Sequence, residues 1–131
     1  MSGKFEQVKQ YVQDMDMMIV SEDVAEELVV VEDEENGIKN LIIDCEAPIV
    51  ILEQVIMEVP EKNTEQLFRR LLQMNRNLVH GAFVLDEKGE VILFRDTLQL
   101  ENLDRNELEG SVHALTLGLS EHGAELLSYL A

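Results

Sequence analysis

The chain has 131 residues, 46% of them hydrophobic, so we expect one domain over residues 1–131 with a core of its own. Its 27 acidic and 10 basic side chains give a net charge of −17, and residues 1–65 carry 17 of the acidic but only 4 of the basic ones. Such a charge argues against partners that need a basic surface, namely nucleic acid and anionic membranes, and favours a basic or amphipathic protein partner.

The acidity has a second interpretation, which is that it only keeps the chain in solution. Cys45 is the only cysteine, so neither an intrachain disulfide nor a cysteine-based zinc site is possible, as is usual in a reducing cytosol. The N-terminal residues lack the apolar segment of a secretory signal, and no apolar run approaches the roughly 20 residues that span a bilayer. We therefore expect a cytoplasmic protein with no membrane segment.

The first half of the chain predicts one helix and three strands. Apolar residues spaced by three and four predict an amphipathic helix over residues 4–19, followed by an acidic connection over 21–27. Residues 28–31 and 38–45 predict two strands of a hairpin, joined by a turn over 32–37 that ends in Asn36-Gly37. Residues 49–59 predict a third strand, which Pro60 ends.

The second half predicts two helices around a hairpin. Asn63, with Gln66 three residues later, resembles a capping box for a helix whose apolar face runs to Leu78. Strands over 82–85 and 90–95 flank a turn that ends at Gly89, and Asp104 is the expected cap of a long final helix. Glycines at 118 and 123 in this helix predict a close contact with another element.

The expected order is therefore α-β-β-β-α-β-β-α, an α+β fold in which helices pack on an antiparallel sheet in two layers. Residues 49–52 and 91–94 are apolar on both faces of their strands. Strands of this kind are usually covered on both sides. Either the helices divide between the two faces, or a second subunit or a client protein covers one of them.

Nothing in the sequence predicts a catalytic, cofactor or metal site. His113 and His122 are nine residues apart, so they do not form the helical pair that binds zinc, and His80 stands alone. The acidic turn at 32–37 has Ile43 where a calcium loop needs its bidentate glutamate. Asp44 and Glu46 flank Cys45, and negative neighbours raise a thiol pKa. Phosphate-binding loops and nucleophile motifs are absent, so we expect a protein that is not an enzyme.

A polar segment, Asn75-Arg76-Asn77, ends the otherwise apolar second helix. We expect Asn75 to satisfy backbone groups at the helix end and at the start of the next strand. Recognition of a partner by Arg76 is the alternative.

The predicted order, together with residues 71–112, resembles the YbjN family and the wider type III secretion chaperone-like fold of CesT and its relatives. The resemblance rests on a segment of the form "LL..N" followed by "G.F.LD..G.V.L...L.L..L". The matching residues are Leu71, Leu72, Asn75, Gly81, Phe83, Leu85, Asp86, Gly89, Val91, Leu93, Leu98, Leu100 and Leu103. These are mostly core and turn residues, so the match concerns the fold more than the function.

The resemblance implies a small acidic protein, commonly a homodimer, that binds other proteins without ATP. Secretion chaperones of this fold hold an effector segment in apolar grooves, whereas YbjN-like members are described as regulators of sensory or stress pathways. Our leading hypothesis is a non-enzymatic, chaperone-like or regulatory homodimer that binds a client protein through apolar sheet and helix surfaces. The alternatives are a small-molecule-responsive regulator and an unrecognised enzyme. The candidate contact residues are Ile49, Ile51, Val55, Met57 and Phe94.

Overall fold

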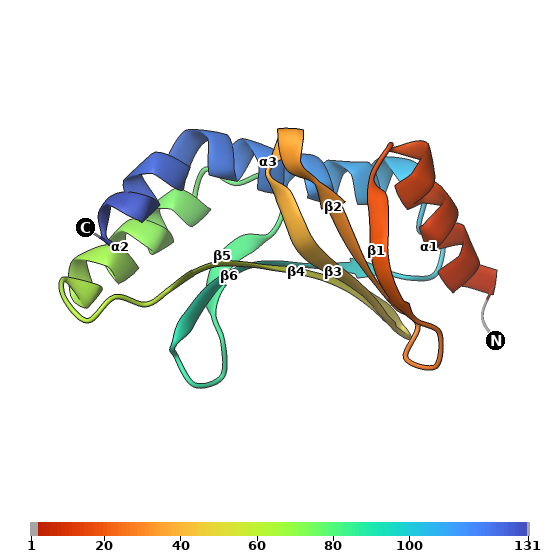
Figure 1. Cartoon of the computed structure of the whole chain (residues 1–131), viewed down its shortest axis with the longest axis horizontal. Coiled ribbons are helices and arrows are strands. Elements are labelled where there is room, and N and C mark those ends of the chain that lie inside the picture. The colour runs from red at the N-terminus through yellow and green to blue at the C-terminus, as the bar shows by residue number, and fades with distance from the viewer. Residues whose placement is uncertain (1–2, 131) are drawn as a thin grey trace.

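The computed structural model describes residues 3–130. These form the helices α1 (Gly3–Asp14), α2 (Thr64–Asn75) and α3 (Arg105–Ser128), the strands β1 (Met18–Asp23), β2 (Leu28–Asp33), β3 (Ile38–Glu46), β4 (Ile49–Glu58), β5 (Ala82–Leu85) and β6 (Val91–Gln99), and a short 3-10 turn, η1 (Glu34–Asn36). The strands make one antiparallel sheet in the order β1-β2-β3-β4-β6-β5. All three helices lie on the same side of it (Figure 1). The expected α+β class, with helices packed on an antiparallel sheet, is confirmed.

The structure adds one strand, β1, that the sequence analysis assigned to the first helix and the connection after it. The helix ends at Asp14, and Asp16 has the left-handed φ of 61° that turns the chain back. Residues 18–23 then pair with β2, and Ile19, which fits the helical stripe by its spacing, packs against the core from a strand instead. Ile19 and Val20 are β-branched and suit a strand, and pairing with β2 outweighs the weak helical pattern.

Of the two predicted helix caps, the one at Asp104 is confirmed and the capping box at Asn63 is not. Asp104 begins α3 as expected, because its side chain accepts a hydrogen bond of 2.8 Å from the backbone N–H of Glu107. The capping box predicted for α2 is wrong. Asn63 has a left-handed φ of 60° and makes no capping bond with its side chain, although its backbone carbonyl accepts the N–H of Leu67.

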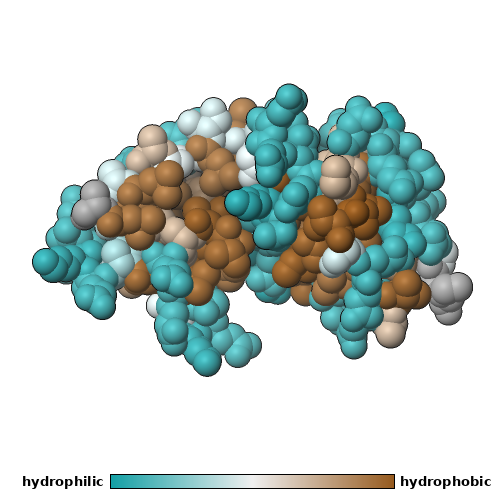
Figure 2. All heavy atoms as spheres, viewed as in Figure 1, coloured by the Kyte–Doolittle hydropathy of each residue, from teal (hydrophilic) through white to brown (hydrophobic). Residues whose placement is uncertain are grey.

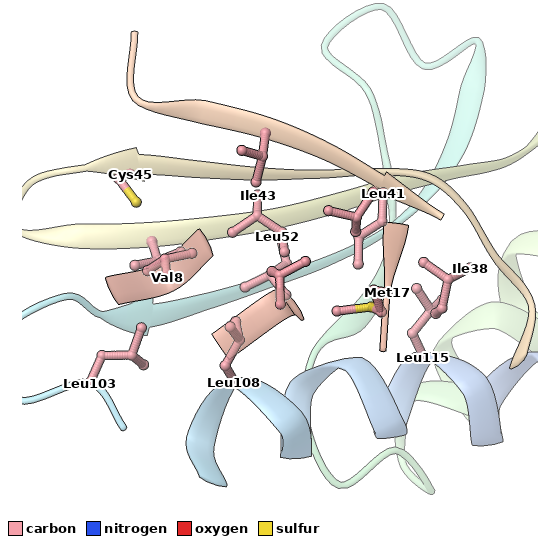
Figure 3. Close-up of a cluster of buried hydrophobic side chains, with 14 of the residues drawn as sticks. Val8, Met17, Ile38, Leu41, Ile43, Cys45, Leu52, Leu103, Leu108 and Leu115 are labelled. Carbon is pink, nitrogen blue, oxygen red and sulfur yellow. The ribbon is translucent and has the colours of Figure 1, made fainter. Parts of the chain in front are cut away.

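The core lies between the helices and one face of the sheet. Its larger part joins α1 and the N-terminal half of α3 to strands β2, β3 and β4; Figure 3 shows side chains such as Val8, Leu108 and Ile43 meeting there. A second part joins α2 and the C-terminal end of α3 to β4, β5 and β6. Half-buried Ile56 and Leu78 pack against both parts, so α3 and the sheet carry one continuous apolar layer.

Gly118 of α3 lies where the close contact was predicted, since a Cβ there would stand 3.1 Å from a methyl group of Leu78. Gly123 has no such neighbour. Across residues 3–130, no helix combines the length and the apolar character that a membrane crossing demands.

Candidate functional site: the open sheet face

The helices leave the other face of the sheet uncovered. Strand register identifies the residues on it, because residues paired across neighbouring strands point to the same side. One row runs Val30–Ile42–Glu53–Arg95 across β2, β3, β4 and β6, and the adjacent row runs Leu28–Asp44–Ile51–Thr97. We define the open sheet face as these two rows with the neighbouring residues Glu46, Ile49, Val55 and Leu93.

The expectation that the strands are apolar on both faces is confirmed. In β4 the side chains of Val50 and Leu52 are fully buried under the helices, whereas Ile49 and Ile51 are only half-buried. The apolar residues of the open sheet face are absent from those that pack on the core beneath the helices. The helices therefore do not divide between the two faces, and within residues 3–130 nothing but neighbouring side chains shields the open one.

An ion pair crosses the middle of this face. The Nη1 of Arg95 donates to Oε1 of Glu53 at 2.8 Å, from directly paired positions on β6 and β4. Both side chains are partly exposed, so the pair contributes little to stability. Because Arg95 is bound to Glu53, its guanidinium group is not available to the other carboxylates of the open sheet face.

Asp44 lies beside this pair among apolar neighbours. Leu28 and Ile51 are its partners across the strands, and Ile42 and Glu46 are the same-face residues along β3. The Oδ1 atom of Asp44 is buried and has no hydrogen-bond partner. Burial first, and then the negative charge of nearby Glu46, raise the pKa of this carboxyl to about 6.

The structure separates the five predicted contact residues. Ile49, Ile51 and Val55 lie together on the open sheet face, where Val55 is 60% exposed. Met57 and Phe94 do not join them, since both point to the helices and are 5% and 1% exposed. A register shift between Val55 and Met57 turns Met57 to the covered side, and Phe94 pairs with buried Gln54. These two residues therefore pack the core and offer no surface to a partner.

The sequence analysis missed Val30, Ile42, Asp44 and Leu93 as members of this face. The signal that could have found them is strand register, which a hairpin turn of known length fixes between two strands. Without the position of the helices, however, the alternation could not say which side is covered.

Apolar side chains are also exposed on the helix side. In the view of Figure 2, one group of apolar side chains lies over α2 and the C-terminal end of α3, and a separate group lies over the strands β1 and β2, with hydrophilic side chains between the two groups. The exposed large apolar residues of the helices and of the segments that follow α2 and α3 are Leu72, Val79, Leu117, Leu127 and Leu130.

The remaining candidate side chains have structural surroundings. No group of three or more His, Cys, Asp or Glu side chains within residues 3–130 could hold a metal ion. The ring of His122 packs edge-on against Phe83. Cys45 is buried on the covered face, and burial first, with the nearby carboxylates of Glu27 and Asp44, raises its thiol pKa to about 11. A thiol in this position is protonated at neutral pH and unreactive.

Asn75 satisfies backbone groups at the start of the next strand, which is one of the two parts of the role expected from the sequence. Its amide nitrogen donates to the carbonyl of Phe83 at 3.1 Å, and its amide oxygen accepts from the N–H of Phe83 at 2.7 Å. These two bonds imitate a strand pairing on the outer edge of β5, which is the last strand of the sheet. Asn75 thus ties α2 to β5 and closes part of an otherwise free edge.

Comparison with known proteins agrees with this architecture. The model of the family CesT_Tir_1, a type III chaperone family, matches residues 1–131. The crystal structure of YbjN from E. coli superposes with a TM-score of 0.71 at 13% identity, covering 92% of each chain. A chain in the structure of the HopA1-SchA chaperone–effector complex superposes with a TM-score of 0.60 at 15% identity, covering 88% of this chain and 91% of the other. At these identities the likeness concerns the fold alone. None of the curated proteins compared by sequence matches this chain.

Proposed function

Because the chain belongs to the CesT_Tir_1 family, we propose that it is a chaperone-like protein that binds a segment of a partner protein through the open sheet face, without catalysing a reaction. The observation that carries the proposal is the uncovered apolar side of β4, where Ile49, Ile51 and Val55 stand two to four residues apart on one face. Apolar side chains that gather on one uncovered face often mark a site of interaction.

The fold supports a binding role for this surface. One of the structures with the same fold is a chaperone bound to an effector, so the architecture is compatible with holding another protein. The sheet is rigid, because its central strands β3, β4 and β6 are paired along most of their length. A rigid surface loses little conformational entropy on binding, which favours affinity.

Selection from random peptides tests the proposal and requires no identified partner. A library of such peptides would be selected against the pure protein, and the enriched peptides would be synthesised and titrated. We expect Ile51→Glu to abolish their binding and Leu72→Glu, a matched change on the helix side, to leave it intact. The opposite pattern would place the binding surface on the helices and contradict the proposal.

We also propose that the protein is a homodimer located in the cytoplasm. The exposed apolar residues of α3, Leu117 and Leu127, give a second copy a surface that leaves the open sheet face available to the partner. Light-scattering mass over a concentration series tests this directly. A stable mass of twice 14.9 kDa would support the dimer, and a monomer at all concentrations would contradict it.

The alternative, a regulator that responds to a small molecule as in the YbjN type, has less support from the geometry. The hollows that border α3 have volumes of about 250 to 270 Å³, and a more polar one beside the turn at Gly89 has about 350 Å³. These volumes lie below or at the lower end of the range of about 300 to 1,000 Å³ that is typical of ligand sites.

A further inference from the structure

The open sheet face is apolar but carries an uncompensated negative charge. Its acidic members are Asp44, Glu46 and Glu53, and its one basic member is Arg95. Since Arg95 is bound to Glu53 at 2.8 Å, the two carboxylates of β3 have no basic partner on this face. A partner that covered the face with apolar side chains alone would remove both carboxylates from water without compensation, which is costly.

Among these carboxylates, Asp44 is the one whose removal from water costs the most free energy. Three of its four same-face neighbours, Leu28, Ile51 and Ile42, are apolar, and its Oδ1 atom is already buried without a hydrogen-bond partner. A lysine or arginine side chain that reached this atom would supply the missing donor, and charge-assisted bonds of this kind are about twice as strong as neutral ones.

A second copy of the chain does not meet this requirement. Two open sheet faces placed together would each bring a net negative charge, and both chains carry −17 overall. The free carboxylates of one copy would meet the same carboxylates, or an Arg95 that is already paired with Glu53. The charge of the face therefore selects a basic partner over self-association.

We propose that the open sheet face receives an apolar protein segment that carries a lysine or arginine, and that this cation pairs with Asp44. The inference rests on the proposed function, because it names the chemistry of the segment that the same surface binds. Ile49, Ile51 and Val55 contact the apolar side chains of the segment, whereas Asp44 and Glu46 select its charge.

Three synthetic peptides serve as probes. Each alternates valine and threonine over about ten residues, and the central residue is lysine, norleucine or glutamate. Norleucine has the aliphatic chain of lysine without the ammonium group, so a comparison of the two isolates the charge. Fluorescence anisotropy of labelled peptides would give Kd for the unaltered protein, for Asp44→Asn, and for Glu61→Gln. The last is a matched control that removes one exposed charge beyond the opposite end of β4.

We expect the unaltered protein and Glu61→Gln to bind the lysine peptide about five- to tenfold more tightly than the norleucine peptide, and the glutamate peptide least. Asp44→Asn should remove most of the preference for lysine. Equal binding of the lysine and norleucine peptides, or a preference that survives Asp44→Asn, would overturn the inference while leaving the proposed function in place. Failure of all three peptides to bind, while peptides selected from the library bind and lose binding with Ile51→Glu, would also overturn only the inference. Failure of the designed and the selected peptides alike would contradict both.

A measurement on the unaltered protein removes any dependence on how the variant folds. The charged groups that face Asp44 are Glu46 on β3, Glu26 before β2 and Glu53 on β4, with Arg95 of β6 held by Glu53. Asp44 takes up a proton near pH 6, so its attraction for a cation weakens below that pH. The preference for lysine over norleucine should therefore shrink between about pH 7.5 and about pH 5. A preference that is constant over this range would count against Asp44 as the partner of the cation.

Discussion

Replacement of Asn75 by alanine should destabilise the protein, because Asn75 satisfies both backbone groups of Phe83 through bonds of 3.1 and 2.7 Å. A neutral hydrogen bond contributes about 1 kcal/mol net, so the loss of two costs about 2 kcal/mol. Phe83 is buried, and leaving its N–H and carbonyl without partners adds up to about 1 kcal/mol. The free energy of unfolding should therefore fall by about 2 to 3 kcal/mol.

Urea denaturation followed by circular dichroism measures this change. With a slope of about 1.5 to 2 kcal/mol per M for a domain of this size, the midpoint should fall by roughly 1 to 2 M. Asn77→Ala, at an exposed position two residues further on, is the control and should leave the midpoint almost unchanged. Asn75→Asp keeps the acceptor for the N–H of Phe83 but loses the donor to its carbonyl, so its midpoint should lie between the other two.

A fall of less than about 0.5 kcal/mol for Asn75→Ala would refute the reasoning, because it would mean that water replaces both bonds at no cost. The variant should also self-associate more readily, since β5 is an edge strand and Asn75 occupies part of its outer edge. Sedimentation of the folded variant would detect such association.

Two further predictions concern backbone conformation and charge. Gly81→Ala should lower the free energy of unfolding, measured by urea denaturation, by about 2 to 5 kcal/mol, because Gly81 has a φ of 71° and a Cβ there would overlap the ring of Phe94. Gly89→Ala is the control, since Gly89 has the same φ but open space around it, and it should lower this free energy by only about 1 to 2 kcal/mol. Equal losses for the two variants would contradict the steric argument. For Asp44, whose pKa rises on folding from 3.8 to about 6, the unfolded chain releases its proton first, so this residue lowers the stability of the fold as pH rises from about 4 to about 6. Asp44→Asn should therefore have a higher free energy of unfolding than the unaltered protein at about pH 7.5 but not at about pH 4. The same difference in free energy of unfolding at both pH values would contradict a raised pKa of Asp44 in the folded protein.

The sequence predicted most of the fold because most of its signals are local. The turn at Asp86–Gly89 and the cap at Asp104 depend on residues a few positions apart, and both occur as expected. Strand β1 could not be predicted in the same way. Its residues continue the helical stripe of α1 by spacing alone, and only their pairing with β2, about ten residues later, makes them a strand.

The candidate site was predicted in part for a related reason. Alternation showed that β4 is apolar on both faces, but a register shift near Val55 places Met57 on the other side from Ile51. Such a shift depends on how β4 fits against β6, which the local sequence does not contain. The sequence analysis considered Asp44 only as a neighbour of Cys45 and not as a site residue, because its environment is made by Leu28 and Ile51, residues of two other strands.

The most direct test of the account is to block the open sheet face chemically and measure binding. A cysteine at Val55 or at Leu72, which are 60% and 73% exposed, would be labelled with a bulky maleimide. The buried thiol of Cys45, with its raised pKa of about 11, should remain unlabelled and need not be removed. We predict that the label at position 55 abolishes binding of the lysine peptide and that the label at position 72 does not. Undiminished binding with position 55 labelled would contradict the central claim that this face holds the partner.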